Sequence, residues 1–167
     1  ENVTDVHSFL GMTSFYRRYV HRYAHLAAPL YELTVKDAQW QFGPRQEEAF
    51  EALKSALTNS PVLILPNPER SYMVVTDAMD TAMGGTLIQN HGKGLQPVAF
   101  LSRRLHPSEV KYYPYDKEMC AMAYCLRKWR HYLEGSVAGV TVMTDQSPAT
   151  TFMNQANLSR TQTRWLK

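Results

Sequence analysis

The sequence has little cysteine and no long apolar run, which argues against a disulfide-rich protein and against a membrane-spanning one. Only two cysteines occur, Cys120 and Cys125. They stand five positions apart on one expected helix, about 140° apart around its axis, so we expect no disulfide between them. Nothing indicates a zinc site or an oxidising compartment. No apolar run approaches the ~20 residues that span a bilayer, so we expect no membrane partner.

Internal repeats at solenoid periods and low-complexity tracts are also missing, which excludes a repeat protein. A content of 44% hydrophobic and 20% charged residues is typical of a globular protein rather than a disordered one. The 167 residues can form one medium domain, or a small domain with an appendage. Because the first residue is Glu1 and not methionine, we expect a piece of a longer protein.

Residues 72–78 form the segment around which the chain is organised. Met73, Val74 and Val75 are consecutive apolar residues, so both faces require burial, as in a central strand. The strand ends at Asp77, and a charge beside a buried strand is costly unless it is paired. Residues 140–145 repeat the pattern and end at Asp145. We expect neighbouring strands that bring two acids together; alternatively, each aspartate caps the turn or helix that follows it.

A third acid, Glu118, lies within the apolar stripe of an expected helix that begins at residue 114 or 115 and ends near 134. Five residues lie within about 60° of it at ~100° per residue: Met122, Cys125, Trp129, Tyr132 and Leu133. A glutamate on this face is expected to pack against the sheet and to need a cation. Three converging carboxylates suit Mg²⁺, and two such ions about 3.5–4 Å apart can activate a water for phosphodiester cleavage.

Basic residues concentrate in two parts of the chain. Residues 15–23 interleave Arg17, Arg18 and Arg22 with aromatic side chains, which suits a surface that follows a nucleic-acid backbone. Residues 103–131 hold seven basic residues against three acidic ones, in a protein of net charge +3. Their candidate phosphate contacts are Arg103, Arg104, Arg127, Lys128 and Arg130. The alternative is that both segments are amphipathic helices with solvated basic exteriors.

The order of elements predicts an α/β protein with a mixed sheet. Helices are expected at residues 4–25, 29–33 and 45–58, and a proline-rich connector at 61–69 separates a helical segment (1–60) from the rest (70–167). Strands at 72–78, 86–90 and 95–101 should form an antiparallel meander.

The second half of the chain adds a parallel strand to this meander. After the long helix, a strand at 137–144 should lie parallel to the central strand through a right-handed crossover. Asp77 and Asp145 would then leave the sheet at the same edge, where open α/β sheets carry their active sites. Two further helices are expected at 147–155 and 159–167.

A series of short sequence motifs spans nearly the whole chain in order. They are Phe9-Leu10-Gly11-Met12, Phe15-Tyr16-Arg17-Arg18-Tyr19, Ala28-Pro29-Leu30, Ala49-Phe50-Glu51-Ala52-Leu53-Lys54, Pro61-Val62-Leu63, Thr76-Asp77-Ala78, Phe100-Leu101-Ser102-Arg103-Arg104-Leu105, Lys117-Glu118, Lys128-Trp129-Arg130-His131-Tyr132-Leu133, Thr144-Asp145 and Arg164-Trp165-Leu166. Together they resemble the Pol polyprotein of gypsy-type LTR retrotransposons, from the end of the reverse transcriptase through the RNase H domain.

The resemblance implies a function. Residues 1–60 would be the thumb or connection of a polymerase, and residues from about 70 an RNase H-like fold in which Asp77, Glu118 and Asp145 are metal-binding acids. The implied activity is endonucleolytic cleavage of RNA in RNA–DNA hybrids with two Mg²⁺ ions, for which Mn²⁺ could substitute. The implied partners are the hybrid and the rest of the polyprotein, inside the cell in a cytoplasmic virus-like particle or in the nucleus.

The chain departs from the family pattern in ways that leave a second function open. Met79 and Gln146 replace a small polar residue and a histidine. No acid follows Asp145, so the family's fourth aspartate is missing, and its last strand and helix are expected to be missing too. The polymerase palm is absent, so the chain should not itself synthesise DNA. The alternative is therefore a catalytically inactive, domesticated remnant that binds nucleic acid or serves as a structural subunit of a larger assembly.

Overall fold

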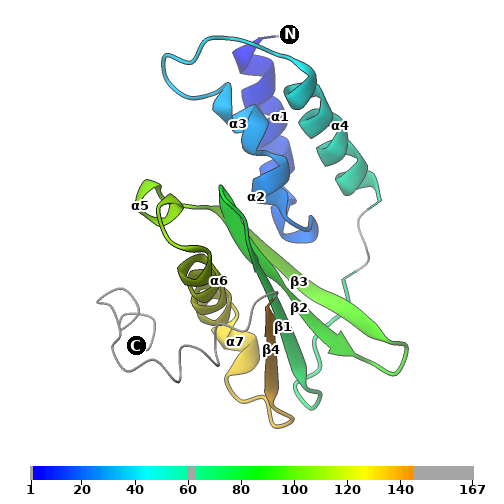
Figure 1. Cartoon of the computed structure of the whole chain (residues 1–167). Coiled ribbons are helices and arrows are strands. Elements are labelled where there is room, and N and C mark those ends of the chain that lie inside the picture. The colour runs from blue at the N-terminus through cyan, green and yellow to red at the C-terminus, as the bar shows by residue number, and fades with distance from the viewer. Residues whose placement is uncertain (1, 60–62, 145–167) are drawn as a thin grey trace.

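The computed structural model describes residues 2–59 and 63–144. Figure 1 shows two groups of elements: a group of helices lies beyond one end of a sheet, and a long helix covers one face of that sheet. Within the described ranges, no helix combines the length and apolar character needed to cross a membrane.

The helical group consists of α1 (Val3–Phe15), the 3-10 turn η1 (Arg17–Tyr19), α2 (Tyr23–Leu26), α3 (Ala28–Glu32) and α4 (Pro44–Thr58). A capping box between Asn2 and Asp5 begins α1, and Pro44 occupies the first turn of α4. These helices bury their own apolar cluster, which includes Leu10 and Leu53. Its members are separate from those of the clusters under the sheet.

The prediction of one helix over residues 4–25 is wrong. The chain leaves α1 after Phe15, and Arg22 adopts a left-handed conformation with φ 53° and ψ 30° before α2 begins. The break allows Val20 and Tyr23 to enter the helical core, at 1% and 4% exposure, while Arg22 is directed toward the sheet. Tertiary packing therefore overrides the helical periodicity of the sequence.

The sheet has the strand order β3-β2-β1-β4. Its strands are β1 (Tyr72–Ala78), β2 (Ala82–Asn90), β3 (Leu95–Arg104) and β4 (Val140–Thr144). The pairs β1–β2 and β2–β3 are antiparallel and β1–β4 is parallel, which confirms the predicted mixed sheet. Three predicted strand boundaries are wrong, because β2 begins at Ala82 rather than residue 86, β3 ends at Arg104 rather than residue 101, and β4 begins at Val140 rather than residue 137.

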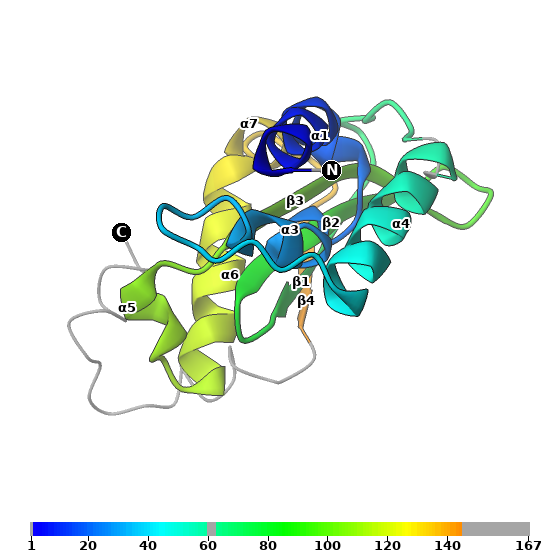
Figure 2. The same ribbon diagram turned by 90° about the horizontal axis from the view of Figure 1, so that it is seen from above.

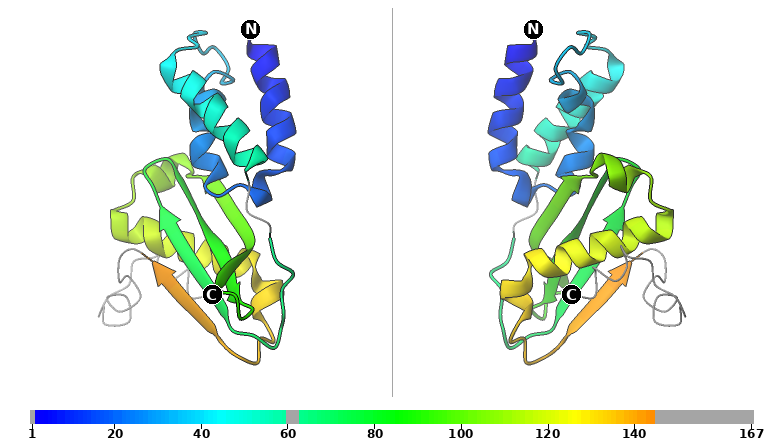
Figure 3. Two further views of the ribbon diagram at one scale, coloured as in Figure 1. Left: turned by 90° about the vertical axis from the view of Figure 1, so that its right-hand side faces the viewer. Right: turned by 90° about the vertical axis from the view of Figure 1, so that its left-hand side faces the viewer.

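The long helix α6 (Pro114–Lys128) follows the short α5 (Pro107–Val110) and crosses one face of the sheet (Figure 3). It buries Cys125 and the adjacent Trp129 against Tyr72 and Val74 of β1. The predicted single helix to residue 134 is interrupted at Trp129, after which α7 (Arg130–Leu133) adds one turn. Both cysteines are free, as expected, and both are buried.

The connector is attached to the sheet before β1 begins. The Ile64 amide donates to the Pro97 carbonyl at 3.0 Å. The buried Gln89 side chain accepts from the Asn67 amide at 2.9 Å and donates to the carbonyls of Asn67 and Arg70. The view in Figure 2 shows the helical group and α6 around the sheet. The helices predicted at 147–155 and 159–167 lie outside the described residues, as does Asp145.

Candidate functional site

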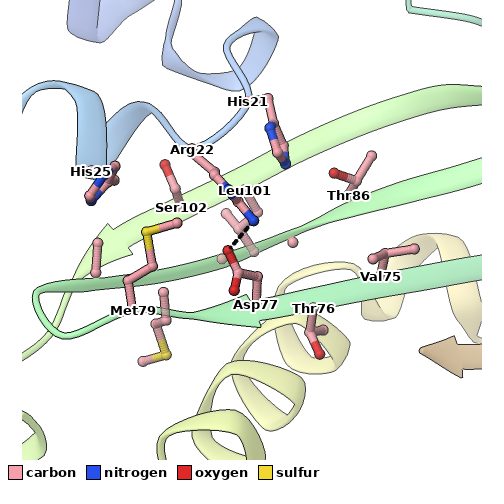
Figure 4. Close-up of a pocket in the computed structure, with 14 residues that line it drawn as sticks. His21, Arg22, His25, Val75, Thr76, Asp77, Met79, Thr86, Leu101 and Ser102 are labelled. Carbon is pink, nitrogen blue, oxygen red and sulfur yellow. Dashed lines mark ion pairs between the residues drawn. The ribbon is translucent and has the colours of Figure 1, made fainter. Parts of the chain in front are cut away.

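Asp77 stands near the end of β1, on the face of the sheet opposite α6. Its neighbour Thr76 is buried on the α6 side together with Val74, and the alternation of a strand turns Asp77 the other way. There its Oδ2 lies 2.7 Å from Nη2 of Arg22, which projects from the turn before α2 (Figure 4). The Asp77 side chain is 23% exposed and that of Arg22 is 45% exposed.

Glu118 reaches the ends of two strands from the other face. Its side chain is directed from α6 to the sheet and the residue is only 6% exposed, as the apolar stripe predicted. Oε1 accepts a hydrogen bond from the Ala78 amide at 3.2 Å, and Oε2 accepts one from the Thr144 hydroxyl at 2.9 Å. Glu118 therefore connects the ends of β1 and β4.

The carboxylates of Asp77 and Glu118 thus flank the end of β1 from opposite faces of the sheet. Asp145 follows directly after Thr144, the residue that binds Glu118, but its own position is not described. Residues 2–59 and 63–144 contain no cluster of three histidine, cysteine or acidic side chains that could hold a metal. The convergence of all three predicted ligands stays a prediction.

The chemistry of this strand end fits a hydrated divalent ion. The Thr76 hydroxyl is fully buried and has no hydrogen-bond partner among the described residues, an arrangement that usually indicates a water or ion. Thr76 is the register partner of Thr144 across the parallel strands. This hydroxyl, on the same face of the sheet as Glu118, and the carboxylates at the strand end are hard oxygen donors of the kind that Mg²⁺ prefers.

A cavity of about 190 Å³ opens beside Asp77, between the helical group and the sheet. Its polar lining residues are His21, Arg22, His25, Thr76, Asp77, Thr86 and Ser102. Burial, and then the charge of Arg22, lower the pKa of His21 below its ordinary value, while Asp77 opposes the shift. His21 is therefore held toward its neutral form next to the ion pair.

The sequence interpretation did not identify Arg22 as the partner of Asp77. It placed Arg22 with Arg17 and Arg18 as a nucleic-acid contact, on the basis of a helix that the structure divides. The two paired residues are far apart in the sequence, and no local pattern links them.

The other predicted phosphate contacts, apart from Arg18, fall into two groups. Arg17 lies beside Arg103 and Arg104, around a shallow pocket at the end of β3. Arg103 is already engaged, because its guanidinium binds both Glu109 oxygens at 2.7 Å and lies over the Tyr124 ring. Arg17 and Arg104 are exposed.

The second group lies at the far end of α6. Arg127 donates to the Ala123 carbonyl at 3.2 Å, and Arg130 pairs with Glu134. Lys128 is exposed beside them. Arg127 stands nine residues from Glu118 along α6, or roughly 14 Å at 1.5 Å per residue. Arg18, which belongs to neither group, donates to the Tyr19 hydroxyl at 2.6 Å.

Comparison with known proteins agrees with this architecture. Residues 42–142, more than half of the chain, match the family described as the RNase H-like domain found in reverse transcriptase. The chain belongs to this RNase H-like family. Its relatives include the Transposon Tf2-3 and Tf2-4 polyproteins of Schizosaccharomyces pombe, each 33% identical over 146 residues, or 87% of this chain. The gypsy-type retrotransposon resemblance is therefore confirmed.

The chain spans about a tenth of the length of these curated relatives, since the match covers 11% of each. Solved structures show the same fold at low identity. A foamy viral protease-reverse transcriptase, in the form called dRH and in complex with double-stranded DNA, has a TM-score of 0.75 at 20% identity, covering 98% of this chain and 29% of that one. The foamy viral enzyme with an RNA/DNA hybrid has a TM-score of 0.70 at 21% identity, covering 99% and 23%.

Proposed function

We propose that this RNase H-like chain is the nuclease part of a retrotransposon reverse transcriptase, and that it cleaves the RNA strand of RNA–DNA hybrids with divalent metal ions. The observation that carries the proposal is the buried Glu118 carboxylate, fixed to the ends of β1 and β4 beside Asp77 and the orphaned Thr76 hydroxyl. Burial of a charged carboxylate is costly unless it is paired or coordinates a metal, which supports a role for Glu118 in a metal site.

Each acid has a proposed role. Asp77 and Asp145 would be primary ligands of Mg²⁺ or Mn²⁺, and Glu118 would bridge to or support a second ion. When bound, two such ions activate a water and stabilise the leaving oxygen of the displacement. The chain's own contribution is orientation: the Ala78 amide and the Thr144 hydroxyl hold Glu118 in one position, so that little reorganisation is needed for reaction.

The proposed partners follow from charge and from the relatives. Two basic groups would contact phosphates of a hybrid duplex: Arg17 and Arg104 near the end of β3, and Arg127, Lys128 and Arg130 at the far end of α6. The rest of a Pol polyprotein would supply the polymerase. The proposed location is within the cell, in a cytoplasmic virus-like particle or in the nucleus.

The test is a cleavage assay with the polyprotein segment that contains this chain. A hybrid with a labelled RNA strand is incubated with Mg²⁺ or Mn²⁺. Asp77→Asn, Glu118→Gln and Asp145→Asn should each abolish cleavage, and Glu51→Gln, which alters an exposed acid on α4, should leave it intact. If the unmodified segment binds hybrid but cuts nothing with either metal, the nuclease proposal is wrong, and the non-catalytic remnant becomes the better account.

A further inference from the structure

The helical group contacts the sheet through a short polar segment, residues 17–26, which comprise η1 and α2. Three contacts fix the segment in place. Arg22 pairs with Asp77 at 2.7 Å, the Ala24 amide donates to the Ser102 hydroxyl at 3.1 Å, and the His21 ring lies 5.6 Å from that of Phe100. The contact is therefore made largely by polar groups rather than by a continuous core.

The two sides of this contact each have their own apolar cluster. Val20 and Tyr23 belong to the helical cluster, whereas Tyr72 and Val74 belong to the cluster between the sheet and α6. Parts that each bury their own core, and that meet through polar groups, can separate without unfolding either one.

Arg22 occupies this contact in a backbone conformation that costs free energy. Its φ of 53° lies in the left-handed region, which residues with a Cβ rarely adopt. Such a conformation persists only where surrounding contacts hold it. Burial of Val20 and Tyr23 in the helical cluster does so here, and the resulting turn directs the Arg22 side chain at Asp77.

We propose that segment 17–26 is a latch over Asp77, in which the Arg22 guanidinium neutralises the carboxylate when no metal is bound. Docking of the latch and binding of a divalent metal at Asp77 then oppose each other. The inference rests on the proposed function, because it takes Asp77 as a metal ligand.

Electrostatics makes docking of the latch and binding of the metal antagonistic. One oxygen of Asp77 already binds a cationic side chain, and a divalent ion at the same carboxylate would lie within a few ångströms of the guanidinium charge. By linkage, a docked latch lowers the affinity for metal by some factor, and bound metal weakens docking of the latch by the same factor.

The first test measures Mn²⁺ binding to the 167-residue chain by calorimetry, without nucleic acid. Arg22→Gln removes the charge of the latch, and we expect Mn²⁺ to bind roughly 3- to 10-fold more tightly, the scale of a partly exposed ion pair. Arg70→Gln is the matched control, because the Arg70 guanidinium donates to the Asn90 carbonyl, away from Asp77. Its affinity should equal that of the unmodified chain.

The Mn²⁺ affinity of Asp77→Asn shows whether a negative result contradicts the latch alone or the proposed function as well. If Asp77→Asn binds Mn²⁺ as well as the unmodified chain does, Asp77 is not a ligand and the proposed function loses its metal site. If Asp77→Asn loses binding but Arg22→Gln binds no more tightly than Arg70→Gln, the latch alone is overturned.

The second test follows the latch directly by hydrogen–deuterium exchange. The Ala24 amide is protected by Ser102 when the segment is docked. Saturating Mn²⁺ should therefore accelerate exchange in peptides covering residues 17–26, and Arg22→Gln should show the faster exchange even without metal. Unchanged or slower exchange in the Mn²⁺-saturated chain would overturn the latch.

Discussion

The hydroxyl of Thr144 donates a hydrogen bond to Oε2 of Glu118 at 2.9 Å, and so connects the last described residue of β4 to the buried acid of α6. The Ala78 amide binds the other oxygen of the same carboxylate. The parallel strands β1 and β4, which are separated in sequence by β2, β3 and three helices, are thus both hydrogen-bonded to one side chain of α6.

Loss of the Thr144 hydroxyl should lower the free energy of unfolding. Thr144→Val keeps the shape of the side chain but removes a donor to a buried carboxylate oxygen, and hydrogen bonds to charged groups contribute about 1.5–3 kcal/mol. Urea unfolding of Thr144→Val should show a free energy of unfolding lower by this amount. Thr144→Ser keeps the hydroxyl and should retain most of the stability of the unmodified chain. Thr141→Val changes an exposed threonine of the same strand and serves as the control. Equal effects of the two valine substitutions would contradict the prediction.

A fall in pH should destabilise the folded protein through protonation of Glu109. Its hydrogen bonds to Arg103, with further help from the His106 amide, lower its pKa from 4.5 to about 2, against the opposing effect of burial. Because the folded pKa is depressed, the stabilisation is complete above pH 4.5 and is lost as the pH falls toward 2. The loss should reach roughly 3 kcal/mol, at about 1.36 kcal/mol per unit.

Unfolding experiments between about pH 6 and pH 2 test this window. Glu109→Gln should be less stable at the upper end and should show a flatter dependence on pH across the window. Glu48→Gln, on the exposed side of α4, should keep the dependence of the unmodified chain. A Glu109→Gln profile parallel to that of the unmodified chain would show that Glu109 does not titrate with folding.

Gly85 should not accept a side chain. A Cβ there would lie 2.5 Å from the Val75 carbonyl oxygen of β1 and 3.0 Å from Sγ of Cys125. Gly85→Ala should therefore destabilise the fold by about 1–3 kcal/mol or more. Gly11→Ala is the opposite case: nothing lies within 4 Å of its Cβ, so it should stabilise α1 by about 0.4–1 kcal/mol. Similar unfolding midpoints for the two variants would contradict the packing of β2.

The basic end of α6 should contact phosphates if the chain binds hybrid duplex. Replacing Arg127, Lys128 and Arg130 together by alanine should reduce the slope of log affinity against log salt by roughly 0.9 for each phosphate that these side chains neutralise. Fluorescence anisotropy between about 50 and 300 mM salt, the range in which such slopes are steep enough to compare, gives this quantity.

A charge-matched variant controls for net charge. Alanine at Lys36, Arg45 and Lys54 removes the same charge from the helical group. If both triple variants show the slope of the unmodified chain, residues 127–130 form a solvated surface only.

The core of the fold was predictable because its signals are local. Three consecutive apolar residues identify the central strand, and the stripe around Glu118 identifies the buried face of α6. The crossover rule then makes β4 a parallel neighbour. The β2 boundary failed because Gly84 and Gly85 indicate a turn, whereas the close approach of β3 and β1 requires glycine inside a strand.

The environment of the site was less predictable, because it depends on long-range packing. The left-handed Arg22 follows from burial of Val20 and Tyr23 in a core that only the folded helices create. Its pairing with Asp77 then depends on how that core sits against the sheet. Periodicity instead indicated one continuous helix, with Arg22 facing solvent or a phosphate.

The attachment of the connector to the sheet has a mechanical consequence. Hydrogen bonds to Gln89 and Pro97 attach the connector to the sheet from Ile64 onward, and α4 ends at Thr58. Five residues, 59–63, therefore join the helical group to the sheet. Even fully extended, such a tether reaches only roughly 20 Å. The helical group is therefore kept at a local concentration in the millimolar range or above. Contacts too weak to hold two separate molecules together suffice here, and their occupancy is independent of protein concentration.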